Sequence, residues 1–80
     1  MNERRKLSRR RALKGGRICF ADHAVECVIR DLSDVGARLG VATVRGIPSE
    51  ISLAFDDGRP SLNGFVRWRK PDTLGVEFAR

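Results

Sequence analysis

No stretch of this sequence approaches the roughly 18 consecutive apolar residues that a membrane-spanning helix needs. No apolar signal segment follows the basic start either. We therefore expect a soluble, cytoplasmic protein that does not insert into membranes. The 80 residues suffice for one small core but not for two. Because 41% of them are hydrophobic and 32% charged, the composition favours a folded domain over a disordered chain.

Side chains that carry metal or nucleophilic chemistry are scarce. The two cysteines, Cys19 and Cys27, lack the close spacing and additional ligands of a zinc site. In a reducing compartment we expect both to be reduced packing residues. The lone histidine, His23, has no recognisable nucleophile arrangement around it, and no glycine-rich phosphate loop leads into a helix. We therefore predict no metal site, no cofactor and no enzymatic activity.

Helical periodicity is also missing, because no window of adequate length has an apolar helical stripe with caps. Apolar residues instead recur at the period of two that half-buried strands require. This alternation predicts strands at residues 17–20, 25–31, 37–41, 51–55, 65–69 and 74–79. Short strands with tight turns favour a closed barrel, which has no unpaired edges. The sequence therefore predicts an all-β fold of six strands.

Two local readings follow from this pattern. Trp68 shares its parity with Val66, which predicts that Trp68 packs in the core, whereas Arg67 and Arg69 lie on the opposite face. We therefore leave Trp68 out of the predicted site.

Gly15-Gly16 precedes the first predicted strand and is either a hinge or an ordinary loop.

Positive charge is concentrated at the start of the chain. Residues 1–17 hold eight Lys/Arg and one acid, Glu3, for a net charge of +7. Residues 18–80 hold eight basic residues and nine acids, for a net charge of −1. A basic arm on a nearly neutral body indicates an anionic partner, which could be nucleic acid, a membrane surface or a small phosphorylated ligand.

The first candidate motif is Arg5-Lys6-Leu7-Ser8-Arg9, which places two guanidinium groups four residues apart. A guanidinium presents a planar fork of donors that fits a phosphate, or the O6 and N7 edge of guanine, with two hydrogen bonds. Taken alone, the motif is more typical of a solvated basic tail.

The second candidate motif is Asp31-Leu32-Ser33-Asp34-Val35-Gly36, which follows the second predicted strand. Asp31 and Ser33 share one strand parity, and Gly36 supplies backbone freedom. Asp31 continues the predicted inward face of the strand, so we expect it at the rim of the barrel. Taken alone, the motif is more typical of an ordinary turn.

In their order and separation, Arg5-x-x-x-Arg9 and Asp31-x-Ser33-x-x-Gly36 together resemble the paired signature of PilZ domains, of the single-domain bacterial type. The resemblance extends to Arg4, to Ala37-Arg38-Leu39 and to the closing Leu74-Gly75-Val76-Glu77-Phe78. It implies a six-stranded antiparallel β-barrel at residues 17–80, preceded by a flexible basic N-terminal arm at residues 1–16.

The resemblance also implies a ligand, cyclic di-GMP, which the arm traps across the mouth of the barrel. Arg5 and Arg9 would contact guanine edges and phosphates. Asp31 and Ser33 would form polar contacts on the opposite wall, where Gly36 allows close approach.

Arg4 and Arg10 would add further contacts. Once ordered by the ligand, the arm would create a surface for a downstream effector protein.

Two alternatives remain open at this stage. The domain could be a PilZ-like interaction adaptor that binds no nucleotide. It could also be a small basic barrel that binds single-stranded nucleic acid through stacking aromatics. We favour the second alternative less, because the four phenylalanines and one tryptophan fall mostly at inward parity.

Overall fold

The structure, a computed structural model, describes residues 10–79 of the chain. These residues form six strands and no helix, so none of them belongs to a helix that could cross a membrane. The strands are β1 (Arg10–Phe20), β2 (His23–Leu32), β3 (Gly36–Gly40), β4 (Glu50–Phe55), β5 (Leu62–Lys70) and β6 (Thr73–Phe78).

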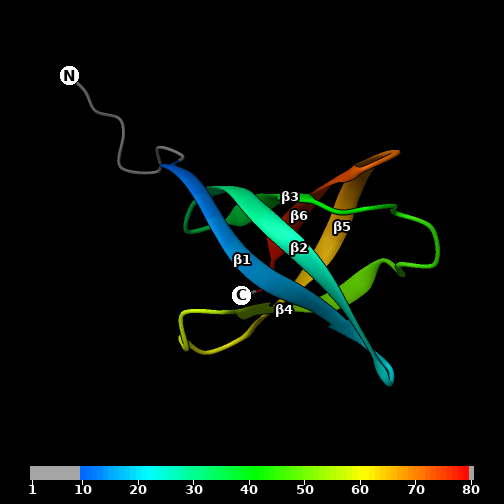
Figure 1. Ribbon diagram of the computed structural model, residues 1–80, viewed down its shortest axis with the longest axis horizontal. Helices are drawn as coiled ribbons and strands as arrows, with labels where there is room; N and C mark the ends of the chain where they lie inside the picture. The colour runs from blue at the N-terminus through cyan, green and yellow to red at the C-terminus, as the bar shows by residue number, and fades with distance from the viewer. Residues whose placement is uncertain (1–9, 80) are drawn as a thin grey trace.

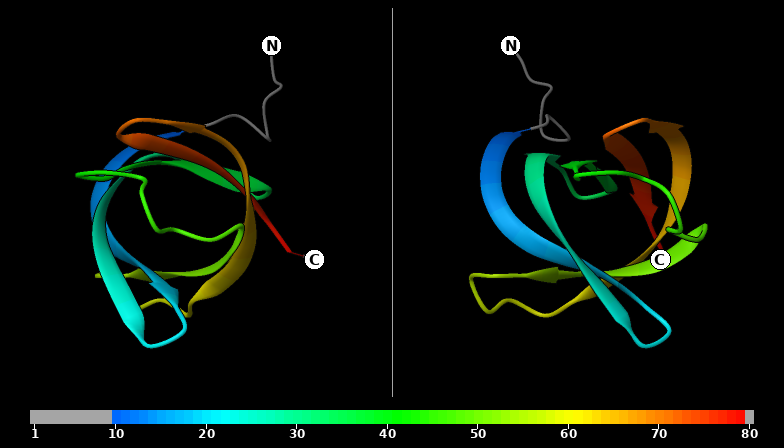
Figure 2. Two further views of the ribbon diagram at one scale, coloured as in Figure 1. Left: turned by 90° about the vertical axis from the view of Figure 1, so that its right-hand side faces the viewer. Right: turned by 45° about the vertical axis from the view of Figure 1, so that its right-hand side comes forward.

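The strands close into one barrel in the order β1-β2-β3-β6-β5-β4, and all neighbouring strands are antiparallel. Figure 1 shows β1 and β2 as a long twisted hairpin, and Figure 2 shows the strands wrapped around a common interior. The predicted all-β, six-stranded antiparallel barrel is therefore confirmed.

The core follows the predicted alternation on most strands. Its fully buried members include Ile18, Ile29 and Leu53, which lie at inward positions of β1, β2 and β4. The segment between β3 and β4 adds Ile47, whose carbonyl oxygen accepts a hydrogen bond from Arg69 Nη1 at 2.5 Å. This hydrogen bond holds the connection between β3 and β4, which are not neighbours in the barrel, against β5.

Both cysteines are free, as the sequence analysis expected. Cys27 is buried in the core, and Cys19 is partly exposed on β1. Burial is the main cause that raises the pKa of the Cys27 thiol to about 11. The thiol is therefore protonated near neutral pH and acts as a small apolar side chain.

The first strand begins earlier than the sequence pattern indicates. β1 starts at Arg10, so residues 10–11 and 14–16, which the prediction assigned to the arm, pair with β2. A register shift between Arg11 and Lys14 interrupts the alternation, which hides this part of the strand from period-two analysis.

The glycine pair considered as a hinge lies inside this paired part of β1. Gly16 is opposite Cys27 on one side and Phe55 on the other. A side chain at Gly16 would bring a Cβ to 2.7 Å from the carbonyl oxygen of Ala54 and 3.0 Å from Ile29. Glycine is therefore needed at this position for close packing of the strands.

Candidate functional site

A hollow of about 400 Å³ is lined by residues of β3, β6 and β5, by the end of β2 and by the turn that follows it. Asp31, Ser33 and Gly36, the three signature residues of the second motif, all line it. The other lining residues are Val35, Ala37, Arg38, Arg67, Trp68, Gly75, Val76 and Glu77. The structure therefore brings the predicted second-motif residues together at one concave site.

The register of the strands aligns one row of residues across this site. Arg11 of β1 is opposite Asp31 of β2, and Asp31 is also opposite Arg38 of β3. Arg38 is opposite Gly75 of β6, which is opposite Trp68 of β5. We call these five residues the site row. It runs from the beginning of β1 to the far wall of the hollow.

Each register shift in the described strands adjoins the site row. The β1–β2 ladder shifts just after Arg11, the β2–β3 ladder just before Asp31, and the β5–β6 ladder just before Trp68. Bulges of this kind re-aim side chains and are common next to functional sites. The irregular part of the barrel therefore coincides with the hollow.

Asp31 is the buried charged residue of the site, with an exposed fraction of 8%. Its Oδ2 lies 2.6 Å from Nε of Arg38. A buried carboxylate is costly without a partner of opposite charge, so this ion pair is what permits Asp31 to sit at the barrel rim. Asp31 is the last but one residue of β2.

The second motif also forms a tight turn, as its ordinary reading predicted. Ser33 Oγ accepts hydrogen bonds from the backbone N–H groups of Val35 and Gly36, both at 3.3 Å. The N–H of Ser33 donates to the carbonyl oxygen of Gly36 at 2.9 Å. A Cβ at Gly36 would collide with the carbonyl oxygen of Val76. Ser33 and Gly36 thus fix the wall of the hollow through the backbone.

The prediction that Trp68 packs in the core is wrong. The shift between Val66 and Trp68 reverses the parity of β5, so Trp68 is 42% exposed and lines the hollow. Its indole lies over Gly75, where any side chain would collide with it. The ammonium nitrogen of Lys70 is 5.7 Å from the centre of the indole ring. The sequence contained the pair Trp68 and Gly75 but gave no sign of the shift.

Arg67, the residue at that shift, forms another part of the wall. Its Nε donates a hydrogen bond of 2.6 Å to Glu77 Oε1, and its guanidinium carbon is 5.5 Å from the ring centre of Phe65. Arg67 is therefore held along the outer surface of β5 and β6.

Of the arginines predicted to contact the ligand, Arg10 alone belongs to the described residues. Arg4, Arg5 and Arg9 lie outside the described residues. Arg10 is the first residue of β1 and its backbone is opposite Leu32, while its side chain lies outside what is described. Within residues 10–79 no cluster of His, Cys, Asp or Glu could hold a metal ion.

Comparison with known proteins agrees with this geometry. A family model described as PilZ domain matches residues 3–80. A search of curated proteins found no match.

Proposed function

Because this chain belongs to the PilZ domain family, we propose that it is a cyclic di-GMP-binding sensor or adaptor domain. Arg5 and Arg9 clamp the ligand against the wall that Asp31, Ser33 and Gly36 line. Binding orders the arm, and the ordered arm presents a surface to an effector protein.

One observation carries the proposal, namely the pairing of Arg11 with Asp31 at the edge of the hollow. Arg9 stands two residues before Arg11 in the sequence, and Arg5 stands six residues before it. Six residues of chain span at most about 22 Å when fully extended. Both guanidinium groups are therefore attached close enough to reach a ligand seated in the hollow.

The chemistry of the wall suits a ligand with two guanines and two phosphates. Asp31 supplies a carboxylate acceptor for the N–H groups of guanine, which arginine and lysine cannot supply. Trp68 supplies an exposed aromatic face, and stacking of a base on such a face is worth about 1–3 kcal/mol. The arginines of the arm supply charge and paired donors for the phosphates.

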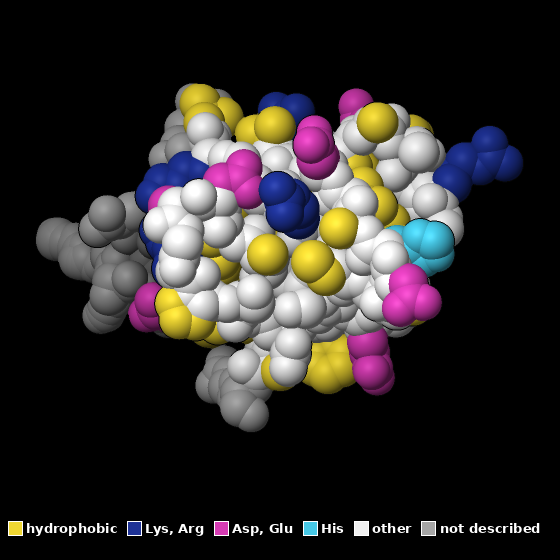
Figure 3. Space-filling model, turned by 60° about the horizontal axis from the view of Figure 1, so that its bottom comes forward, with side chains coloured by type: hydrophobic (Ala, Val, Ile, Leu, Met, Phe, Trp, Pro, Cys, Tyr) yellow, Lys and Arg dark blue, Asp and Glu magenta, His cyan; other side chains and the backbone are white. Residues whose placement is uncertain are grey.

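Nucleic acid is supported less well by the described surface. The hollow has the volume of a small-molecule site, about 400 Å³, whereas single-stranded nucleic acid occupies an extended basic groove. On the face shown in Figure 3, basic, acidic and apolar side chains are interspersed. An arm that bound alone would give weak, salt-dependent affinity with little base preference.

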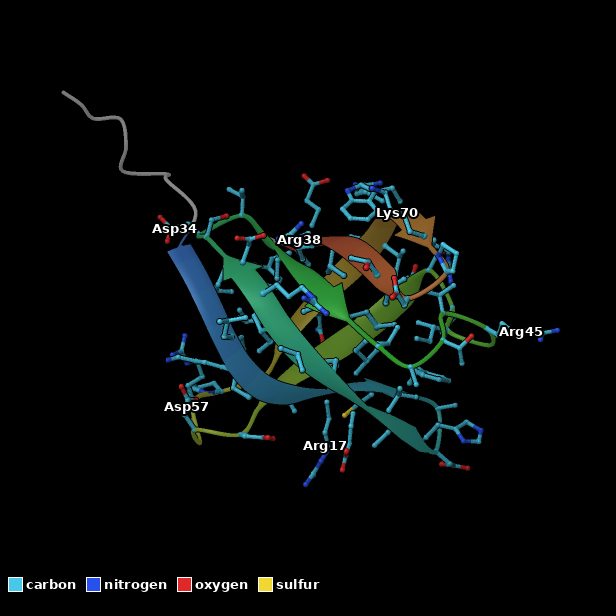
Figure 4. The ribbon with its side chains drawn as sticks, turned by 45° about the horizontal axis from the view of Figure 1, so that its top comes forward. Arg17, Asp34, Arg38, Arg45, Asp57 and Lys70 are labelled. Carbon is cyan, nitrogen blue, oxygen red and sulfur yellow. The ribbon has the colours of Figure 1, made fainter. Side chains whose placement is uncertain are left out.

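The test is calorimetric titration of cyclic di-GMP into the full chain at moderate salt. A parallel titration of GTP, a guanine nucleotide of similar chemistry, is the comparison ligand. We expect saturable binding to the wild type, no comparable binding of GTP, and roughly 10- to 100-fold weaker binding to Arg9→Ala. Arg17→Ala is the matched control. It removes the same charge from the exposed face of β1, well away from Arg38 in Figure 4.

Two outcomes would contradict the proposal. Absence of binding heat with the wild type would leave an interaction adaptor as the better account. Equal weakening by Arg9→Ala and Arg17→Ala would indicate a general charge effect and not a clamp.

A further inference from the structure

The ion pair between Asp31 and Arg38 is asymmetric in its exposure. The Asp31 side chain is 11% exposed, and the Arg38 side chain is 44% exposed. Arg38 therefore bridges the protected carboxylate and the open hollow that both residues line. The approach that defines the ion pair is between Arg38 Nε and Asp31 Oδ2, at 2.6 Å.

A bulge at Arg30 creates this pair. In the β2–β3 ladder, Val28 is opposite Gly40 and Ile29 is opposite Leu39, so a regular ladder would continue with Asp31 opposite Ala37. The shift omits Arg30 from the pairing and places Asp31 opposite Arg38 instead.

The extra residue is accommodated because Gly40 has no side chain. A Cβ at Gly40 would lie 2.6 Å from Nε of Arg30, so the Arg30 guanidinium occupies the space above this glycine. The local sequence thus re-aims one arginine away from the site and another toward the site carboxylate.

A carboxylate has two oxygens and about four acceptor positions. The ion pair with Arg38 through Oδ2 restrains rotation of the carboxylate, and Oδ1 adds further acceptor positions to the group. The Watson–Crick edge of guanine presents adjacent N–H donors, from the ring N1 and the exocyclic amino group. A carboxylate held in one orientation can discriminate that edge, whereas a freely rotating one loses the alignment.

We propose that Arg38 is a positioning residue that sets the guanine selectivity of the site by holding the Asp31 carboxylate in this orientation. The inference rests on the proposed binding of cyclic di-GMP. It assigns to Arg38 a role that acts through Asp31, while the arginines of the arm act on the ligand directly.

The test compares two probes, cyclic di-GMP and cyclic di-IMP, by calorimetry on wild type and Arg38→Gln. Cyclic di-IMP has the same phosphates and ring system and lacks only the exocyclic amino groups. We expect the wild type to prefer cyclic di-GMP by roughly 10-fold, as one charge-assisted hydrogen bond predicts. In Arg38→Gln this preference should fall to within roughly twofold, and binding of cyclic di-GMP should weaken more than binding of cyclic di-IMP.

Arg17→Gln is the control for loss of charge and should keep the wild-type preference. Asp31→Asn/Arg38→Gln removes both charges and guards against misfolding of the single variant, with circular dichroism as the check on folding. If Arg38 acts through Asp31, the double variant and Asp31→Asn should show the same lost preference.

The outcomes separate the two proposals. If wild type binds neither probe, the proposed function fails and the inference fails with it. If wild type binds but Arg38→Gln weakens both probes equally, Arg38 contacts a part common to both ligands, such as phosphate, and the positioning role is overturned. An unchanged Arg38→Gln variant also overturns it.

Discussion

Two carboxylate–arginine pairs in this barrel have almost the same separation but very different surroundings. At the hollow, Arg38 Nε is 2.6 Å from Asp31 Oδ2. In the turn after β4, Arg59 Nη2 is 2.7 Å from Asp57 Oδ2. The Asp31 side chain is 11% exposed and the Asp57 side chain is 37% exposed. Distance alone therefore says little about which pair the fold depends on, since burial decides the cost of losing a partner.

The exposed pair has a structural role at the other side of β1. Asp57 also lies 3.5 Å from Nζ of Lys14, and the N–H of Asp56 donates to the carbonyl oxygen of Gly15 at 3.2 Å. These contacts join the β4–β5 turn to β1 just after its bulge. The Asp57 pair thus helps to hold the β4–β5 turn against β1 at the surface, whereas the Asp31 pair lines the hollow.

The largest effect on stability should come from removing the arginine of the buried pair. In Arg38→Ala the Asp31 carboxylate keeps its burial without its partner, and we expect a loss of about 2 kcal/mol in the free energy of unfolding. Asp31→Ala should cost less, because the half-exposed Arg38 stays hydrated. Urea denaturation of both variants measures this. A greater loss in Asp31→Ala would contradict the asymmetry.

An effect of intermediate size is expected at Leu13, which lies on β1 between Arg11, opposite Asp31, and Lys14, which contacts Asp57. This residue has a φ of 45° and is 65% exposed, so a leucine occupies the left-handed region without burying its side chain. Leu13→Gly should stabilise the domain by about 0.5–1 kcal/mol, because relief of strain exceeds the entropic cost of glycine. Leu13→Ala, which keeps a Cβ, is the control and should show no such gain in thermal denaturation.

The smallest effect should come from the exposed pair, and it should depend on pH. Hydrogen bonds from Arg59 are the main cause that lowers the pKa of Asp57 from 3.8 to about 2. Because the folded-state pKa is the lower one, the stabilisation is present above about pH 4 and is lost as the pH falls toward 2. Asp57→Asn should therefore change the melting temperature only slightly at pH 7, and the difference from wild type should vanish near pH 2. A difference that persists in acid would contradict this assignment.

The alternation of apolar residues in the sequence predicted the fold correctly where the strands are regular. It failed at the bulges, where the alternation of inward and outward side chains is interrupted. Alternation located six strands and core positions such as Ile29 and Leu53, because inward residues of a regular strand recur every second position. It placed the start of β1 too late and put Trp68 in the core, because bulges at both places change the parity. A bulge depends on the register between strands, and one strand considered alone carries no record of it.

Sequence reasoning also predicted part of the candidate site. Asp31, Ser33 and Gly36 were found as a motif, and all three line the hollow. The contact of Arg38 with Asp31 could not be foreseen, since a regular ladder would have paired Asp31 with Ala37. Arg4, Arg5 and Arg9 stay predictions, because they lie outside the described residues.

The indole resting on Gly75 makes the domain its own optical reporter. Trp68 is the single tryptophan of the chain, so all of the tryptophan emission comes from one wall of the hollow. Indole emission shifts and quenches with the polarity and the stacking partners around the ring. Any molecule that binds in the hollow should therefore change the emission spectrum of the unlabelled protein. A molecule that binds elsewhere on the barrel should leave that spectrum almost unchanged.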